Sequence, residues 1–185
     1  MEELIDVLDE NGKKIGKIAT RSEVHKQGLW HRGAVVVLID KNKKILMQQR
    51  SKNVETFPEC WDVSAAGHIS AGQSSNEAAI RELSEEIGVH ASLNELIPLV
   101  HYKEGTIVRD GCIENLFFDC YLIEKEQIDI DNIQMQTNEV NQVKLCNIDE
   151  VMELVNTKKV LPRDRLYKEL GRYLKYKSNN VIWIV

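Results

Sequence analysis

The sequence lacks the features that mark several common classes of protein. No apolar run approaches the ~18 residues that a membrane-spanning helix needs, and the acidic N-terminal segment has no signal-peptide apolar core. Only four cysteines occur among 185 residues, and no two of them are spaced as C-x-x-C. These absences argue against a membrane protein and against a disulfide-stapled secreted domain. They predict reduced thiols and a cytoplasmic location.

An excess of positive charge is also missing. The chain has 24 Lys and Arg against 29 Asp and Glu, which leaves a formal net charge of −5. Such a chain is not expected to bind a nucleic-acid polymer or an anionic membrane surface. No internal repeat or low-complexity linker divides the sequence. Its length and its hydrophobic content of 43% therefore predict a single domain, residues 1–185, with a sizeable core.

The sequence does contain clear strand and helix patterns. Apolar stretches flank Asn11-Gly12, which predicts an N-terminal β-hairpin, and the β-branched run over 33–39 predicts a buried central strand. Further strands are expected at 45–50, 61–66, 96–102, 113–123 and 139–145. Helices are expected at 21–29, 74–87, 147–155 and 163–176. Together they predict an α/β domain with a mixed sheet in two or three layers.

The helix expected at 74–87 carries an unusual acidic arc. Three carboxylates recur there at i, i+3 and i+4, next to the apolar stripe: Glu82, Glu85 and Glu86. Each like-charge pair costs a few tenths of a kcal/mol in an isolated helix. Such an arc either faces water or holds a cation, and hard oxygen ligands suit Mg²⁺ or Mn²⁺. Gly88 is expected to end the helix.

The stretch 67–89 as a whole resembles the Nudix box, G-x5-E-x7-R-E-U-x-E-E-x-G-U, in which U is aliphatic. Only the first glutamate departs, because that position holds Gln73. The resemblance implies the Nudix α/β/α sandwich, with an N-terminal hairpin extension over 1–30 and a C-terminal helix over 162–176. It also implies a MutT-like, Mg²⁺-dependent (or Mn²⁺-dependent) pyrophosphohydrolase that acts on a small-molecule diphosphate.

The same resemblance assigns roles to the residues of the box. Glu85 and Glu86 become metal ligands, together with the backbone carbonyl of Gly67. Glu82 becomes a metal-bound or base-like glutamate, and Arg81 an orienting cation that can reach Glu85. The expected catalytic residues are therefore Glu82, Glu85 and Arg81.

Residues around the box complete the expected site. Gln73 can accept a hydrogen bond but brings no charge, so its presence threatens the rigidity of the loop. Glu114 on a later strand is expected to add a carboxylate to the metal, or else is an ordinary exposed glutamate. Arg50 and Lys52 are candidates for binding phosphate, and both can equally be solvated surface cations. His68 is expected at the substrate.

The resemblance continues outside the box. The segments VHKQGLWHRG and FPECWDVSAAGH are similar to the isopentenyl diphosphate isomerase-like branch of Nudix proteins. True isomerases use a cysteine directly before the glycine of the Gly-His pair. Here that position holds Ala66, whose methyl group cannot transfer a proton, and Cys60 lies seven residues upstream of Gly67. The sequence therefore favours hydrolysis over isomerisation.

That branch also carries a histidine-rich metal site. His68 matches its histidine after glycine, and His25 and His31 lie near the positions of its two N-terminal histidines. Together with Glu114 they could form a second metal site. The alternative is that these histidines cap, pack or face water.

Three functions remain open at this point. The first is hydrolysis of a diphosphate linkage in a nucleoside diphosphate derivative or a related small molecule. The second is isomerisation of isopentenyl diphosphate. The third is a non-catalytic nucleotide-binding regulator, which Gln73 favours and the three retained, mutually repelling carboxylates oppose. The sequence does not identify the substrate, and the hairpin or the final helix could form a homodimer contact.

Overall fold

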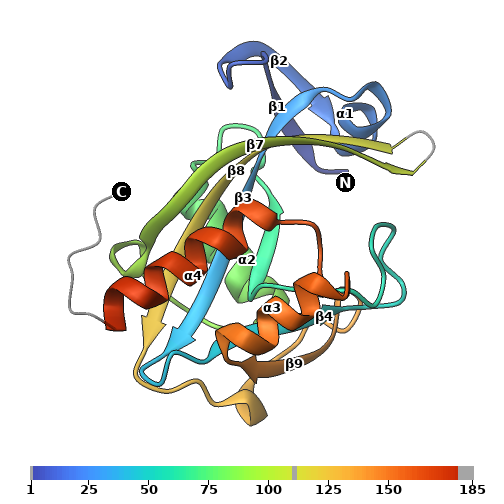
Figure 1. Ribbon diagram of the computed structural model, residues 1–185. Coiled ribbons are helices and arrows are strands. Elements are labelled where there is room, and N and C mark those ends of the chain that lie inside the picture. Colours follow the sequence, from blue (N-terminus) through green and yellow to red (C-terminus); the bar gives the residue numbers. More distant parts are fainter. Residues whose placement is uncertain (1, 110–111, 179–185) are drawn as a thin grey trace.

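The computed structural model describes residues 2–109 and 112–178. Its sheet is built around the central strand β3 (Trp30–Asp40), the buried run predicted from the sequence (Figure 1). β3 pairs in parallel with β8 (Cys112–Lys125) along its whole length. On its other edge it pairs antiparallel with β6 (Ala65–His68) and then with β4 (Ile45–Arg50). The sheet is therefore mixed, as predicted.

The remaining strands extend this sheet at its edges. β7 pairs with β8, while β5 and β9 pair with β4. β1 and β2 form the predicted N-terminal hairpin, which contacts β3 through β1. The bounds of these strands are β1 (Leu4–Leu8), β2 (Lys14–Thr20), β5 (Trp61–Asp62), β7 (Ile97–Arg109) and β9 (Val140–Cys146).

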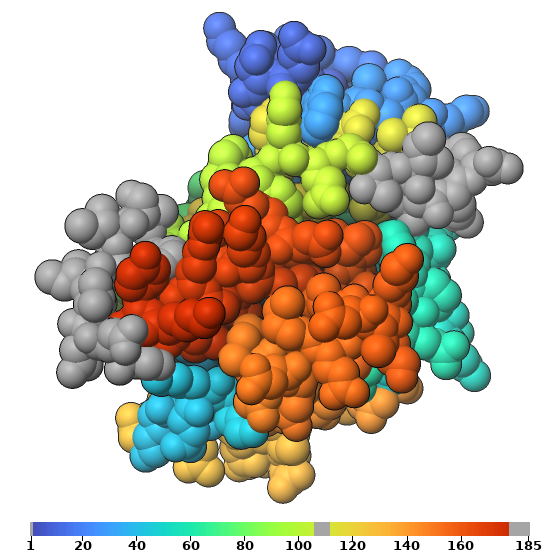
Figure 2. Space-filling view, viewed as in Figure 1, coloured from blue at the N-terminus to red at the C-terminus, as the bar shows by residue number. Residues whose placement is uncertain are grey.

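Helices cover both faces of the sheet. Side chains alternate along β3, so successive residues pack against helices on opposite faces. The even-numbered residues pack against the helix α2 (Ser75–Ile87): Ala34, Val36 and Leu38. The odd-numbered residues pack against α3 (Ile148–Asn156) and α4 (Asp164–Ser178): Val35, Val37 and Ile39. Figure 2 shows α3 and α4 covering one face of the molecule, below the hairpin. This is the predicted α/β/α sandwich.

Ser64 explains one difference from the predicted elements. The strand expected at 61–66 is split into β5 and β6. The Ser64 hydroxyl accepts from the Leu38 N–H at 2.8 Å and donates to the Leu46 carbonyl at 2.7 Å. A side chain therefore bridges β3 and β4 at the point where the two strands diverge. The hydrophobic pattern of the sequence does not indicate that a side chain makes hydrogen bonds to both strands here.

Other element boundaries differ by smaller amounts. The helix α1 (Arg21–Gln27) ends before Gly28, which has φ +61°. β7 continues to Arg109, beyond the predicted end at 102, because β8 pairs with it over the added length. The pairing of β7 with β8 has a register shift between Pro98 and Val100. The predicted C-terminal helix begins at Asp164.

Candidate functional site

The box helix α2 is fixed at both ends by local interactions. Ser74 is the N-cap: its hydroxyl accepts from the Glu77 N–H, and the Glu77 carboxylate accepts from the Ser74 N–H. This reciprocal capping box is worth ~1 kcal/mol. Gly88 ends the helix in the left-handed conformation, as predicted, with φ +66°. Because the apolar stripe of α2 is buried on the sheet, the acidic arc beside it has a fixed orientation.

The loop between β6 and α2 rests on the N-terminal hairpin. The Ala71 N–H donates to the Leu4 carbonyl at 2.8 Å, and the Gly72 N–H donates to the Asp6 carboxylate at 2.9 Å. The Ser70 hydroxyl donates to the Glu3 carboxylate at 2.9 Å. The hairpin therefore holds the loop that leads from Gly67 into the box helix.

Gly67 and Glu82 are in close contact. Pairing between β6 and β3 places Gly67 opposite Ala34, with the Glu82 carboxylate directly against it. A Cβ atom at position 67 would lie 2.0 Å from Glu82 Oε1, so any larger residue there would displace the Glu82 carboxylate. Burial raises the pKa of Glu82 to about 7, although Arg81 beside it works in the opposite direction. The contact explains why the box has glycine at this position.

Glu86 lies deeper than Glu82 and is 3% exposed. Its carboxylate accepts from Gln48 Nε2 at 2.6 Å and from the Ala66 N–H at 3.2 Å. Burial and the neighbouring Glu82 raise its pKa well above the ordinary value. Within the described residues it has no ion pair with a lysine or arginine, so its charge is not compensated.

Arg81 contacts both of the other box glutamates. Its guanidinium lies 2.8 Å from Glu82 Oε1 and 2.9 Å from Glu85 Oε2. It also donates to the His68 carbonyl at 2.9 Å and to Gln73 Oε1 at 3.4 Å. The contact with Glu85 is the one expected from the i, i+4 spacing. Gln73 therefore accepts a hydrogen bond from Arg81 through its uncharged amide oxygen.

The three box glutamates do not form one tight group. Groups of three possible ligand atoms within 4.8 Å of one another do occur in the described part of the chain, but they are built on His25 and not on the box. Glu85, with its side chain 54% exposed, is drawn toward Arg81. The donor set still suits a divalent cation, because Glu82 and Glu86 are buried oxygen donors whose charge needs compensation.

A cavity of about 250 Å³ lies beside the box. Arg81, Glu82 and Glu85 contribute to its wall, whereas Glu86 lies behind that wall. The other expected site residues that line it are Arg50, Gly67, His68 and Glu114.

The two expected phosphate-binding cations have different positions. Lys52 lies outside the cavity lining. The Arg50 guanidinium is in the lining, where it donates to the Thr56 carbonyl at 3.0 and 3.1 Å. The structure therefore places only Arg50 at the cavity.

Five charged residues at the cavity were not predicted from the sequence: Glu3, Arg21, Glu104, Glu139 and Arg163. Each comes from a segment outside the box. Glu139 contributes to the raised pKa of both Glu82 and Glu86. None of the five belongs to a recognisable motif. Only the folded chain brings them to the box.

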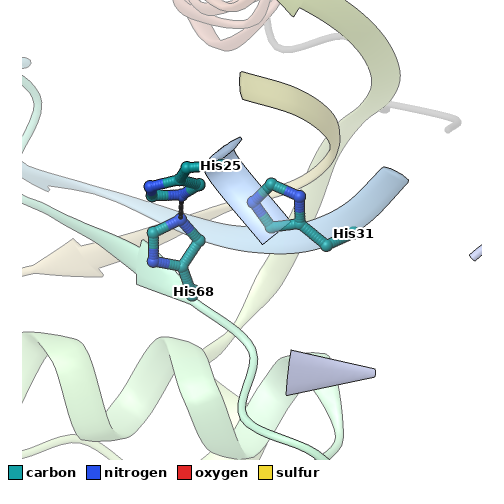
Figure 3. A group of neighbouring side chains, drawn as sticks. All are labelled: His25, His31 and His68. Carbon is teal, nitrogen blue, oxygen red and sulfur yellow. Dashed lines mark hydrogen bonds between the residues drawn. The ribbon is translucent and has the colours of Figure 1, made fainter. Parts of the chain in front are cut away.

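Three histidines meet between α1, β3 and β6 (Figure 3). His25 Nε2 lies 3.2 Å from His68 Nε2, and the three ring centroids are 5.1 to 5.6 Å apart. His31 Nδ1 donates to the Leu29 carbonyl at 2.9 Å, while its buried Nε2 has no hydrogen-bond partner among the described residues. Burial lowers the pKa of His31 to about 4. A neutral imidazole with an unpaired, buried nitrogen fits a metal ion.

The isomerase alternative lacks its proton donor in the structure as well. Ala66 lies on β6 opposite Val35, and its N–H is bonded to Glu86. Within the described chain no cysteine lines the cavity. Cys60 is among the residues that do not contribute to the wall.

Comparison with known proteins identifies the class of this chain. Residues 29–170 match the model of the NUDIX domain family, so the chain belongs to that family. Nudix hydrolase 3 of Arabidopsis thaliana is 34% identical over 181 residues, which is 96% of this chain but only 22% of that protein. An uncharacterized Nudix hydrolase of Clostridium acetobutylicum is 34% identical over 160 residues, 85% of this chain and 76% of that protein.

Within the family the chain lies in the isomerase-like branch. An isopentenyl-diphosphate Δ-isomerase of Nocardia farcinica is 34% identical over 92 residues, which cover 50% of this chain and 53% of that protein. The predicted membership of the Nudix hydrolase superfamily, in this branch, is confirmed. The prediction of a Nudix-type enzyme agrees with the hydrolase names of the relatives.

Solved structures share the fold. A Deinococcus radiodurans protein superposes with a TM-score of 0.71 at 18% identity, over 92% of this chain and 98% of that one. A Caenorhabditis elegans Ap4A hydrolase gives a TM-score of 0.56 at 17% identity, over 78% of this chain and 97% of that one. No helix in the described part of the chain has the length and apolar character that crossing a bilayer requires.

Proposed function

We propose that this protein is a divalent-metal-dependent hydrolase that cleaves a diphosphate linkage in a nucleoside diphosphate derivative or a related small molecule. The observation that carries the proposal is the pair of buried carboxyls at the box. Glu82 lies against Gly67 in the cavity wall, and Glu86 is buried beyond it, without a cationic partner among the residues that the structure describes. Two neighbouring buried carboxylates are costly for the fold. Either a bound cation or a bound proton must compensate their charge.

The metal would be held by oxygen donors of the box. The proposed ligands are Glu82, Glu85, Glu86, the Gly67 carbonyl and Glu114, which are hard donors suited to Mg²⁺ or Mn²⁺. When bound, the ion supplies charge neutralisation at the phosphate oxygens and lowers the pKa of water.

The protein's own groups position and deprotonate the attacking water. Glu82 is the favoured general base over Glu85, because it is held against the loop while Glu85 extends toward solvent. Arg81 anchors the helix to the loop through the His68 carbonyl, and it orients both Glu82 and Glu85.

The cavity also supports a phosphate-bearing substrate. Arg50 is held by Thr56 at the wall, and Arg21 and Arg163 line the same space. His68 completes the proposed substrate contacts. Phe57 and Phe118 add aromatic surface, against which the other part of the substrate can pack. These features favour a small molecule that carries both phosphates and an apolar or aromatic group.

A panel of diphosphate compounds tests this function. The purified chain would be incubated with nucleoside diphosphate derivatives and isoprenoid diphosphates, with and without Mg²⁺, and the phosphate products measured. Metal-dependent cleavage of at least one compound is expected. Formation of dimethylallyl diphosphate from isopentenyl diphosphate would favour the isomerase instead, and substrate binding without turnover would favour the regulator.

The proposal also covers the cellular location, the kind of substrate and the oligomeric state. The four cysteines are all free thiols, which suits the reducing cytoplasm. The substrate is taken to be a small molecule and not a polymer. A homodimer through the hairpin or the final helix stays a prediction; the exposed apolar side chains of the hairpin are Leu4, Ile15 and Ile18.

A further inference from the structure

Arg163 is a buried cation whose hydrogen-bonding capacity is only partly used. It lies directly before α4, is 7% exposed and lines the cavity. Its Nε and Nη2 atoms donate to the two carboxylate oxygens of Asp62 at 2.9 and 3.0 Å, and its Cζ atom lies 4.9 Å from the centroid of the Phe118 ring. Among the described residues its Nη1 atom has no hydrogen-bond partner. A guanidinium held on one side in this way can still donate from the other.

Glu104 lies within electrostatic reach of this guanidinium. It is a half-buried residue of β7, it pairs with Leu116 of β8, and it lines the same cavity. Burial raises the pKa of Glu104, although the charge of Arg163 acts in the opposite direction. Within the described part of the chain its carboxylate accepts no hydrogen bond and forms no ion pair. The cavity therefore has an acceptor and a donor that are not bonded to each other.

The order of strands separates this pair from the box. Gly67 lies on β6 and Glu104 on β7, with β3 and β8 between them. Three strand spacings correspond to roughly 14 Å along the sheet. A diphosphate at the box therefore leaves Glu104 and Arg163 to the group that is attached to it. Leu116 and Phe118 add apolar surface to the cavity lining.

We propose that Glu104 and Arg163 are specificity-determining residues, which select a diphosphate whose attached group has a hydrogen-bond donor and an acceptor side by side over one with a hydrocarbon chain. This inference rests on the proposed function, because it concerns the substrate of the same site. The acceptor of the ligand bonds to the guanidinium, and its donor bonds to the carboxylate. The edge of a nucleobase and the hydroxyls of a sugar both have this chemistry.

The selectivity follows from the cost of leaving buried polar groups unpaired. A polar ligand group replaces the hydrogen bonds that solvent makes to Glu104 and Arg163. A hydrocarbon chain excludes the solvent and replaces none of these bonds. Since Phe118 can pack against either kind of group, the apolar wall does not distinguish them.

Binding of matched diphosphonates tests this preference without catalysis. The full chain would be titrated calorimetrically in Mg²⁺ with methylenediphosphonate and with its esters of the common ribonucleosides, of ribose and of geraniol. The bridging carbon prevents hydrolysis. We expect a nucleoside ester or the ribose ester to bind at least about 10-fold more tightly than the geranyl ester. Comparing the nucleoside esters with the ribose ester shows whether a base or a sugar supplies the polar groups.

Glu104→Leu should reverse the preference. Loss of the carboxylate should weaken binding of the favoured ester at least about 10-fold, and the new apolar surface should strengthen binding of the geranyl ester. Glu126→Leu is the matched control, because it removes the same charge from a side chain that is 81% exposed and lies outside this cavity. It should leave both affinities within about twofold.

Arg163 needs a paired substitution. Replacing it alone would leave Asp62, which is 1% exposed, as an uncompensated buried charge. Asp62→Asn combined with Arg163→Gln removes both charges together and should also weaken binding of the favoured ester. Circular dichroism shows whether this double variant folds, and Glu104→Leu decides the matter if it does not.

The results separate this inference from the proposed function. A geranyl ester that binds as tightly as the polar esters would overturn the selectivity alone. So would a preference that persists in Glu104→Leu or in the folded double variant. Failure of methylenediphosphonate and all its esters to bind would count against the diphosphate site itself, and therefore against both.

Discussion

Glu86 shows how burial and charge act together on one side chain. Its carboxyl is 3% exposed, it accepts from an amide and a backbone N–H, and its neighbour Glu82 is also acidic. A neutral group of the same shape would satisfy the two hydrogen bonds only in part, yet it would avoid the cost of a buried charge. The carboxyl is therefore costly for stability, and a metal-binding role accounts for it.

Glu86→Gln should separate function from stability. We expect metal-dependent hydrolysis to fall about 100-fold or more, because a ligand charge is lost. The metal-free variant should unfold at the same temperature as the native chain or higher. Phosphate release and thermal unfolding measure the two effects. Glu77→Gln is the matched control, since glutamine also serves in a capping box; an equal loss of activity there would contradict the assignment.

Gln73 is the one position at which the box departs from its family pattern. Its amide oxygen accepts from Arg81 Nη2 at 3.4 Å and from the Ser70 N–H at 3.3 Å. A carboxylate would make the first of these a charge-assisted bond, which is roughly twice as strong. Gln73→Glu should therefore stabilise the chain by about 0.5–1 kcal/mol, as measured by urea unfolding. Gln73→Ala should be less stable than the native chain, and the reverse order would refute this account of Arg81.

At the scale of elements, the sequence predicts most of what local chemistry determines. The strand at 45–50 and the helix ending before Gly88 are found where they were expected, because apolar period, caps and a glycine stop are all local signals. The break at Ser64 could not be predicted. It depends on a hydroxyl that joins β3 to β4, which are brought together only by the sheet.

The contact between β6 and α2 has a sharp consequence. Gly67→Ala would place a methyl group 2.0 Å from Glu82 Oε1, so the carboxylate must move. Hydrolysis should fall by at least about 100-fold, since a misplacement of about 1 Å can have that effect. Gly171→Ala is the control, because a Cβ there meets nothing within 4 Å in the described part of the chain. Circular dichroism should show that both variants fold; full activity in Gly67→Ala would contradict the placement of Glu82.

At the scale of the whole molecule, the sequence leaves the site incomplete. The box residues come from one continuous stretch and can be named from a motif. Arg21, Glu139 and Arg163 reach the same cavity from three other parts of the chain. Their proximity depends on the order of strands in the sheet, which no local pattern encodes.

The pH dependence of global stability is predicted from Glu82. Its folded-state pKa of about 7 lies above the ordinary value of 4.5, so its contribution is complete below about pH 4.5 and declines as pH rises to about 7. The full difference is about 3 kcal/mol at most. His31, whose pKa is lowered to about 4, has the opposite effect over an overlapping range.

The contribution of Glu82 can be isolated by comparing the thermal unfolding of the metal-free native chain with that of Glu82→Gln from pH 4 to pH 8. The native chain should lose stability relative to the variant as pH rises, and Mg²⁺ should reverse that loss above pH 7. Parallel curves for the two proteins would show that folding does not raise the pKa of Glu82.

The hydrogen bonds from Ala71 and Gly72 to the N-terminal hairpin have a consequence for motion. Amide hydrogens that are tied to Leu4 and Asp6 should exchange with deuterium only when the hairpin lifts away. Their exchange rates therefore report how often the loop between β6 and α2 separates from the hairpin. The segment that sets this rate lies outside the residues matched by the family model, which begin at 29. We therefore expect substitutions at Leu4 and Asp6 to change how fast these two amide hydrogens exchange.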